Sequence, residues 1–190
     1  MSHFTSKLLR SEIFPEEKII FFWKGLLSQW VQKMFYSSSL QLNVLCAEQA
    51  MMLYKARFFL DQESFDLILN ESSPKEQQRL GRLIKNYKEE LWEEVRFQAI
   101  CQINYDKFSQ IEEWKEILLL TSAYELVEAS PFDRIWGIGM AADNPKILQR
   151  ELWGRNLLGK ALMDARTRIA NPEKEERLVD GNGQSAGSNL

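Results

Sequence analysis

The sequence predicts a compact, single-domain and mainly α fold with a few short strands. The chain has 190 residues, of which 45% are hydrophobic and 27% charged, a composition typical of one globular domain with its own core. Several segments carry apolar residues at helical spacing. The glycines and prolines that mark turns are spaced for helices rather than for many short strands. These three observations together indicate the fold class.

The first half of the chain contains one ambiguous stretch and two predicted helices. The aromatic run at the start of residues 19–30 favours a strand, whereas the later part of this stretch fits a loop or a helix. Residues 47–59 lack glycine and proline and are rich in good helix formers, which predicts a buried helix. Ser73-Pro74 suits the N-cap and first position of another helix, which we expect to pass Arg82 and end at about Lys85.

Helical patterns continue through the second half. One long helix is predicted by a stripe of apolar residues that share a face: Trp92, Val95, Ala99 and Ile103. Residues 111–120 predict a further helix, and the short apolar pair Leu126-Val127 fits a strand or an extended core segment. A final helix is predicted by a second stripe: Leu158, Ala161, Leu162, Ala165 and Ile169. We expect the domain to span residues 14–170 and the polar, glycine-containing residues 171–190 to form a flexible tail.

Composition excludes several classes of function. A net charge of -3 and a pI near 5.4 argue against a protein that holds long nucleic acid by neutralising its phosphates. Cys46 and Cys101 have no CxxC spacing, and His3 is the only histidine, so neither a thiolate nor a histidine metal site is indicated. The sequence shows no signal segment and no membrane-spanning stretch, and we expect a cytoplasmic protein without a metal or cofactor.

The first candidate for chemistry is an acid and an amine on one predicted helix. Glu48 and Lys55 are seven positions apart, which places them on nearly the same face, two turns or about 10 Å apart. They would stand beside a mostly apolar wall that includes Met51 and Met52. A polar helix edge that faces water would explain the same pattern.

The second candidate is the loop that follows Leu126-Val127. Glu128 and Asp133 supply carboxylates beside the aromatic Trp136, and Gly137 and Gly139 allow close approach of a ligand to the backbone. These features suit a pocket for a sugar and a base, although an ordinary glycine-containing turn has the same composition.

Cationic and aromatic residues elsewhere supply candidates for ligand binding. Arg79, Arg82 and Lys85 recur every third residue and would form either a phosphate clamp or a solvated stripe. Arg155 and Asn156 would present either an anion site or a simple helix start. Trp92 would stack on a base or belong to the core.

The order of these segments resembles the NADAR family over most of the chain, from about Phe21 to Arg166. The resemblance rests on five groups of residues: Phe21-Phe22 with Ser28-Gln29-Trp30; Ala47 to Met52 with Lys55-Ala56; Leu80-Gly81-Arg82 with Lys85-Asn86 and Trp92; Leu126 to Ser130, Asp133 and Trp136 to Gly139; and Trp153 to Gly159 with Leu162-Met163 and Arg166. Residues 25–35 depart from the family pattern, because they replace a more turn-like, proline-containing stretch.

The resemblance implies an N-glycosidase with a mainly helical fold and no metal. It implies catalytic roles for Glu48, Lys55, Glu128 and Asp133. It implies substrate binding by nine further residues: Trp30, Arg82, Lys85, Trp92, Trp136, Gly137, Gly139, Arg155 and Asn156. The implied substrates are phosphoribosylamino-pyrimidine intermediates of riboflavin synthesis or, alternatively, ADP-ribose attached to guanine bases of DNA or nucleotides. A non-catalytic module that binds ADP-ribose or a nucleotide is the alternative of another class.

Cleavage of a ribose–nitrogen bond passes through a cation-like sugar, which needs nearby negative charge and a proton for the leaving nitrogen. We expect Glu48 or Asp133 to handle the proton and position water. We expect Glu128 to stabilise the sugar cation and to help hold Lys55. Attack of Lys55 on the opened ribose as a Schiff base is the alternative, and it requires an amine whose pKa is lowered by burial.

Overall fold

The computed structural model describes residues 11–172, and the residues expected to form the tail lie almost entirely outside this range. Within it, six α-helices and two small sheets make up the regular structure. Helices dominate, as the sequence predicts, but the sheets take a larger part than the description "mainly α" conveys. No helix in residues 11–172 has the length and apolar character that crossing a membrane requires.

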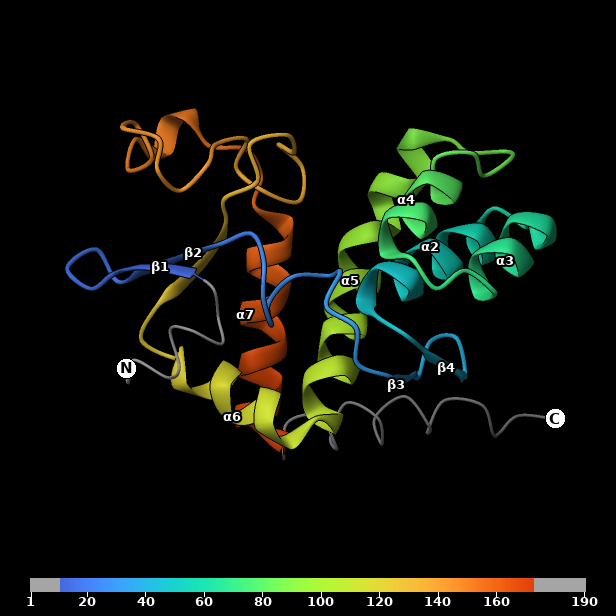
Figure 1. Ribbon diagram of the computed structural model, residues 1–190, viewed down its shortest axis with the longest axis horizontal. Helices are drawn as coiled ribbons and strands as arrows, with labels where there is room; N and C mark the ends of the chain where they lie inside the picture. Colours follow the sequence, from blue (N-terminus) through green and yellow to red (C-terminus); the bar gives the residue numbers. More distant parts are fainter. Residues whose placement is uncertain (1–10, 173–190) are drawn as a thin grey trace, which may run out of the picture.

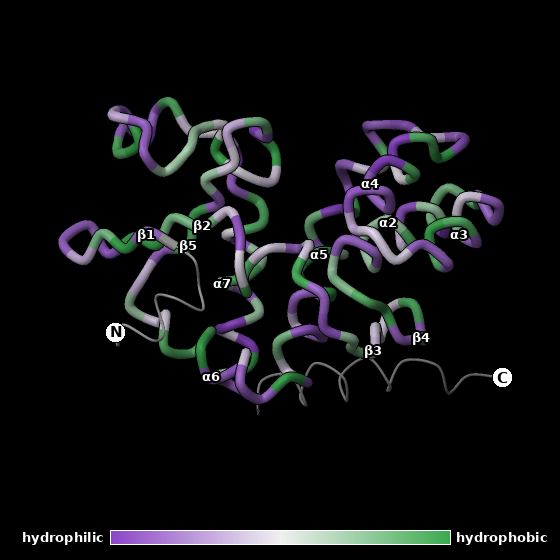
Figure 2. Tube along the Cα trace, viewed as in Figure 1, coloured by the Kyte–Doolittle hydropathy of each residue, from purple (hydrophilic) through white to green (hydrophobic). Residues whose placement is uncertain are grey.

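The larger sheet contains three strands in the order β1-β2-β5. Strand β1 (Ser11–Phe14) pairs antiparallel with β2 (Ile19–Phe22), and the turn between them is hydrophilic (Figure 2). Strand β2 also pairs in parallel with β5 (Glu125–Glu128), with Phe22 opposite Glu128. The carboxyl ends of β2 and β5 therefore lie at the same edge of the sheet, which is where α/β proteins often bind ligands.

Helices α5 (Glu89–Gln110) and α7 (Leu157–Ala170) form the centre of the molecule, between the β1-β2-β5 sheet and a group of three helices (Figure 1). The other helices are α2 (Ala47–Phe58), α3 (Gln62–Leu69), α4 (Pro74–Gly81) and α6 (Glu112–Leu120). Helix α5 packs along α7 in the middle, α2 packs on α3, α4 and α5, and α7 packs on β5 (Figure 1). The chain thus has one half built around the β1-β2-β5 sheet and another built around α2, with α5 and α7 between them.

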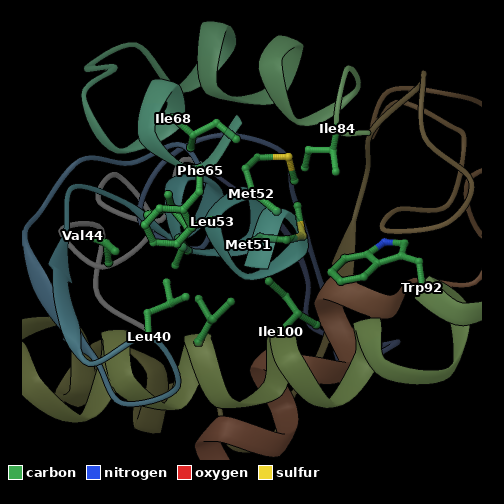
Figure 3. Packing of buried hydrophobic residues seen from close by; sticks show 14 of the residues in the cluster. Leu40, Val44, Met51, Met52, Leu53, Phe65, Ile68, Ile84, Trp92 and Ile100 are labelled. Carbon is green, nitrogen blue, oxygen red and sulfur yellow. The ribbon is translucent and has the colours of Figure 1, made fainter. Parts of the chain in front are cut away.

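Two packed clusters follow this division. Helix α2 contributes Met51, Met52 and Leu53 to one cluster, which also contains Trp92 and Ile100 of α5 (Figure 3). The strands β2 and β5 and helix α7 meet in the other cluster, which includes Ile20, Leu126 and Leu158. Trp136, which is half-buried, packs against both clusters and so connects the two halves.

Most elements agree with the sequence-based predictions, and the differences have local causes. The ambiguous residues 19–30 divide into strand β2 and a turn-rich loop, and Leu126-Val127 lies in a strand. The helix that begins at Pro74 stops at Gly81 instead of near Lys85, because the residues after it turn toward α5 through Asn86, whose φ is 60°. Helix α3 and the hairpin of β3 (Phe35–Ser37) and β4 (Leu42–Val44) were not expected.

Candidate active site

A cavity of about 1050 Å³ opens between the two halves of the molecule. Its walls come from the loop after β2, helix α2, the end of α4, the start of α5 and the loop after β5. Eight of the thirteen residues that the sequence assigns to the site line it, namely all four candidate catalytic residues and four of the nine binding residues: Trp30, Glu48, Lys55, Arg82, Trp92, Glu128, Asp133 and Trp136. The fold thus gathers residues that are more than 100 positions apart into one concave surface.

Glu48 lies in the first turn of α2, where the helix start fixes its position. The Cys46 thiol caps the helix by accepting from the Gln49 amide, and the Glu48 amide donates to the Gln29 carbonyl at 3.0 Å. The Glu48 side chain is only 2% exposed, and its Oε1 has no hydrogen-bond partner among residues 11–172. Burial raises the pKa of this carboxyl to about 7, although the side chains of Trp30 and Gln78 and the charge of Arg82 oppose the rise.

Glu128 ends strand β5 and faces the same cavity. The Asn156 side chain holds its backbone, because this amide accepts from the Glu128 N–H at 3.0 Å and donates to the Leu126 carbonyl at 2.9 Å. Burial, followed by the charges of Asp133 and Glu48, raises the pKa of the Glu128 carboxyl to about 8. Its Oε2 is buried and, within the described part of the chain, has no partner. Glu48 and Glu128 are therefore two acids at one cavity whose pKa values lie close to neutral pH, and we refer to them as the acid pair.

Asp133 is the third acid at the cavity and also shapes the loop that carries it. Its Oδ1 accepts from the backbone N–H groups of Ile135 and Trp136, at 2.7 and 2.8 Å. Its charge is among the causes that raise the pKa values of Glu48 and Glu128. One oxygen of Asp133 thus fixes the Trp136 turn, while its charge opposes ionisation of the acid pair.

Lys55 lies on the same helix as Glu48, two turns further along α2. Its ammonium donates to the Gly81 carbonyl at 2.9 Å and stands 4.0 Å from the centre of the Tyr87 ring. Burial lowers the pKa of this amine, and the charge of Glu89 is the largest effect that opposes this shift. The expected contact between Glu128 and Lys55 is not what holds the amine, since its direct partners are Gly81 and Tyr87.

A chain of polar contacts continues along the wall that carries Lys55. The Tyr87 hydroxyl donates to Glu89, and the buried Arg96 bridges Glu89 and Glu93 at 2.8 and 3.0 Å. Arg155 completes the chain by pairing with Glu93. Arg155 therefore supports the cavity at a distance and is not part of its lining as the structure describes it.

The expected cation stripe does not converge on the cavity. Arg82 lines it, but Arg79 pairs with Glu76 at 2.6 Å and Lys85 pairs with Glu63 at 2.5 Å on exposed surfaces. The early end of α4 explains the difference, because helical spacing no longer holds beyond Gly81.

Gly137, Gly139 and Asn156 shape the site through backbone packing and do not line the cavity. The backbone of residues 134–138 bonds to residues 154–158 in a series that includes Asn156 N–H to Gly137 O and Leu158 N–H to Trp136 O. A Cβ at Gly137 would stand 2.7 Å from the Glu128 carbonyl oxygen, and Gly139 has a φ of +75°. These residues are required by close backbone packing rather than by direct contact with the cavity.

Several lining residues were not expected from the sequence: Trp23, Lys24, Gln78, Tyr87, Glu89, Arg96 and Phe132. A buried lysine, Lys107, was missed as well. It is 0% exposed, and its ammonium donates to the carbonyls of Leu26 and Ser28 at 3.1 and 2.9 Å, which fixes the loop after β2. A lysine within the apolar face of a long helix was the one signal that pointed to it.

Several known proteins are similar to this chain in sequence. The family model described as the NADAR domain matches residues 21–170. A protein of Acanthamoeba polyphaga mimivirus named N-glycosidase R617 is 36% identical over 145 residues, which are 74% of this chain and 85% of that protein. The riboflavin biosynthesis protein PYRR, chloroplastic, of Arabidopsis thaliana is 37% identical over 99 residues, 50% of this chain and 15% of that protein.

One bacterial relative is matched in both sequence and structure. The protein of Escherichia coli (strain K12) named N-glycosidase YbiA is 32% identical over 117 residues, 62% of this chain and 67% of that protein. The NMR structure of the E. coli protein YbiA superimposes with a TM-score of 0.66 and 26% identity, and the match covers 88% of this chain and 94% of that one.

Proposed function

Because this chain belongs to the NADAR family and is a hydrolase of N-glycosyl compounds, we propose that it cleaves the ribose–nitrogen bond of a phosphoribosylamino-pyrimidine intermediate of riboflavin synthesis. The substrate would be a small phosphorylated N-riboside. The name of the Arabidopsis relative supports this substrate class. We further propose that residues 14–170 form the catalytic domain and that the protein acts in the cytoplasm, which fits its two free, buried cysteines.

The observation that carries the proposal is the acid pair. Glu48 and Glu128 each place a buried carboxyl oxygen that has no hydrogen-bond partner in residues 11–172 at one cavity that Lys55 and Arg82 also line. Carboxyl groups are rarely buried without partners, because desolvation of the charged form is costly. A ligand that supplies a leaving nitrogen and a sugar cation would satisfy both carboxyl groups.

The reaction follows from the charge states of the pair. Because their pKa values are raised to about 7 and 8, both Glu48 and Glu128 are partly protonated near neutral pH, so one carboxyl can donate a proton while the other is ionised. The protonated carboxyl donates to the base nitrogen as the C1′–N bond breaks, and the electron pair of that bond leaves with the base. The ionised carboxyl stabilises the cation-like ribose and takes a proton from the water that attacks C1′. The products are ribose phosphate and the free base.

Lys55 and Arg82 suit the phosphorylated end of the substrate. Both line the cavity. The charge of Arg82 lowers the pKa of Glu48 and also that of Lys55. Asp133 lines the same cavity, where it fixes the Trp136 turn and its charge favours the protonated form of Glu128. Attack by a neutral Lys55 on the opened sugar is the alternative route that the lowered pKa of this amine permits.

A second substrate is favoured by the size of the cavity. Its volume of about 1050 Å³ is at the upper end of small-molecule sites, which leaves room for a diphosphate and a second nucleoside. Removal of ADP-ribose from a guanine base would use the same acid pair on the same type of bond. If the protein only bound ADP-ribose without turnover, the ligand would also fill the cavity, but no step would require a proton from Glu48 or Glu128.

The test is to incubate the purified protein with each phosphoribosylamino-pyrimidine and with an ADP-ribosylated guanine oligonucleotide. Chromatography follows the release of ribose phosphate or ADP-ribose. We expect turnover of the first substrate class, and loss of about 100-fold or more in kcat for Glu48→Gln and Glu128→Gln, since general acid–base catalysis contributes at least this much. Turnover of the ADP-ribosylated guanine oligonucleotide alone would contradict the first substrate class and would support ADP-ribosyl guanine as the substrate.

Controls separate the remaining alternatives. Glu112→Gln changes an exposed carboxylate on α6 and should retain full activity. Binding of ADP-ribose without any product would favour the binding module. Sodium borohydride added during turnover should leave Lys55 unmodified, and a reduced adduct at Lys55 would replace direct hydrolysis with the Schiff-base route.

A further inference from the structure

Two aromatic rings at the rim of the cavity are not used by the reaction described above. Trp23 is 43% exposed and Phe132 is 87% exposed, yet both line the cavity. Single exposed apolar residues are common on protein surfaces, whereas exposed rings that meet at a cavity indicate a contact surface for a ligand. The two rings contact each other, with centroids 6.1 Å apart and planes inclined by 57°. Together the two rings form an aromatic surface at the cavity that a flat ligand can contact.

Their position in the sheet places the rings beside the acid pair. Trp23 directly follows the last residue of β2, and β2 pairs in parallel with β5 so that Phe22 lies opposite Glu128. Phe132 belongs to the loop that leaves β5 after Glu128. Both rings therefore stand beyond the carboxyl ends of two neighbouring parallel strands, and one of these strands ends in a member of the acid pair.

Two cationic residues, Lys55 and Arg82, mark the end of the cavity opposite the two rings. Lys55 belongs to α2 and Arg82 directly follows α4, and both helices lie in the half of the molecule away from β2 (Figure 1). On the aromatic side the cation is Lys24, whose ammonium stands 5.3 Å from the centre of the Trp23 ring. Lys24 can donate to a ring carbonyl oxygen of a base that stacks there. The phosphorylated sugar would then point toward α2 and α4 and the base toward the rim.

We propose that Trp23 and Phe132 form the subsite for the leaving base, a flat heteroaromatic ring that stacks at the mouth of the cavity. This inference rests on the proposed function, since it assigns the two ends of the same substrate. It adds that the base leaves directly into solvent and that groups attached to its outer edge extend beyond the protein. Substituents on the outer edge of the base should therefore be tolerated.

The experiment measures base binding without requiring turnover. The fluorescent base 2-aminopurine is titrated into wild-type protein and into the Phe132→Ala and Trp23→Ala variants, and quenching reports stacking. Removal of one stacking ring should raise the Kd of 2-aminopurine about tenfold, because a stacked base contributes roughly 1–3 kcal/mol by alanine substitution. Ribose 5-phosphate, titrated by calorimetry, should bind all three proteins equally. Phe132 is so exposed that its removal leaves the fold intact.

Tyr36→Ala is the matched control, because Tyr36 is 46% exposed and does not line the cavity. Its Kd for 2-aminopurine should equal that of the wild type. Equal base binding in wild type and both rim variants would overturn the subsite even if the enzyme turns over its substrate. Weakened base binding in both variants supports the subsite even if neither proposed substrate is cleaved. The two proposals therefore fail separately.

Discussion

The burial of Glu48 and Glu128 makes the stability of the folded protein depend on pH. Both carboxyl groups have pKa values raised well above the usual range of glutamate, mainly by burial. In the unfolded chain they would ionise at about pH 4.5, so the folded protein holds more protons than the unfolded chain between that pH and about 7 to 8. Stability must fall as pH rises through this window, because the folded state has to release protons that it binds tightly.

We predict that a Glu48→Gln/Glu128→Gln variant loses less stability than the wild type between pH 5 and pH 8. Glutamine keeps the shape of the protonated acid but has no proton to release. The shift of Glu48 alone corresponds to a difference on the order of 3 kcal/mol at the alkaline end. Urea unfolding at pH 5, 6.5 and 8 measures it. Parallel pH profiles for the variant and the wild type would show that folding does not raise the pKa values of the two carboxyl groups.

At the same scale, the sequence predicts a residue well where local spacing decides its position. Glu48 and Lys55 both line the cavity because seven helical positions return them to one face. Lys85 was placed by the same reasoning and lies outside the cavity, since the helix that would carry it ends at Gly81. Tyr87 and Glu89 were missed, because their proximity to Lys55 depends on how the chain between α4 and α5 folds back. No local pattern encodes such a contact.

The elements that carry the acids depend on a close contact between α7 and β5. Gly159 lies in the first turn of α7, and a Cβ there would stand 2.1 Å from the Leu126 carbonyl oxygen and 2.5 Å from the Asn156 side-chain oxygen. Asn156 has a φ of 51° and holds the Glu128 backbone. The helix can approach the strand closely enough for this bridge only because position 159 has no side chain.

We predict that Gly159→Ala destabilises the fold by about 2–3 kcal/mol, although alanine is the better helix former by roughly 1 kcal/mol. The clash is with backbone, which cannot move aside as a flexible side chain can. We also expect kcat to fall, because displacement of Asn156 releases the Glu128 backbone. Thermal unfolding and steady-state kinetics measure the two effects. Lys160→Ala, at the exposed neighbouring position, should change stability by no more than about 0.5 kcal/mol. A neutral or stabilising Gly159→Ala would mean that α7 and β5 tolerate a wider separation.

Element types were easier to predict than their partners. Helices α5 and α7 follow from apolar stripes at helical spacing, and α2 follows from its run of good helix formers. The hairpin of β3 and β4 has only three residues in each strand, too few for alternation to be visible in the sequence. The parallel pairing of β2 with β5 joins residues more than 100 positions apart, and it is this pairing that brings Glu128 beside the loop after β2. Pairing at such separation is set by the packing of the whole chain.

For the whole molecule, the central feature is that the cavity walls come from both halves. The loop that carries Trp23 to Val31 is held by Lys107 from α5, while the wall with Lys55 and Arg82 belongs to the cluster around α2. A ligand that reaches both walls adds contacts between halves that otherwise meet mainly through α5, α7 and Trp136. Binding should therefore stabilise the two sides together.

We predict that a bound product slows amide hydrogen exchange on both sides of the cavity, in residues 23–31 and 128–136 on one side and in residues 48–55 and 82–89 on the other. A one-site ligand at 100 times its Kd adds about 2.7 kcal/mol of stability, which for a chain of this size raises the Tm by roughly 5–10 °C. Ribose 5-phosphate and ADP-ribose are tested separately, and unphosphorylated ribose serves as the control because it lacks the group that Arg82 and Lys55 would bind. Exchange that slows only around α2 would show that the ligand contacts one wall and would contradict the prediction. Slowing on both sides would show that the ligand joins the half that carries Glu48 to the half that carries Glu128.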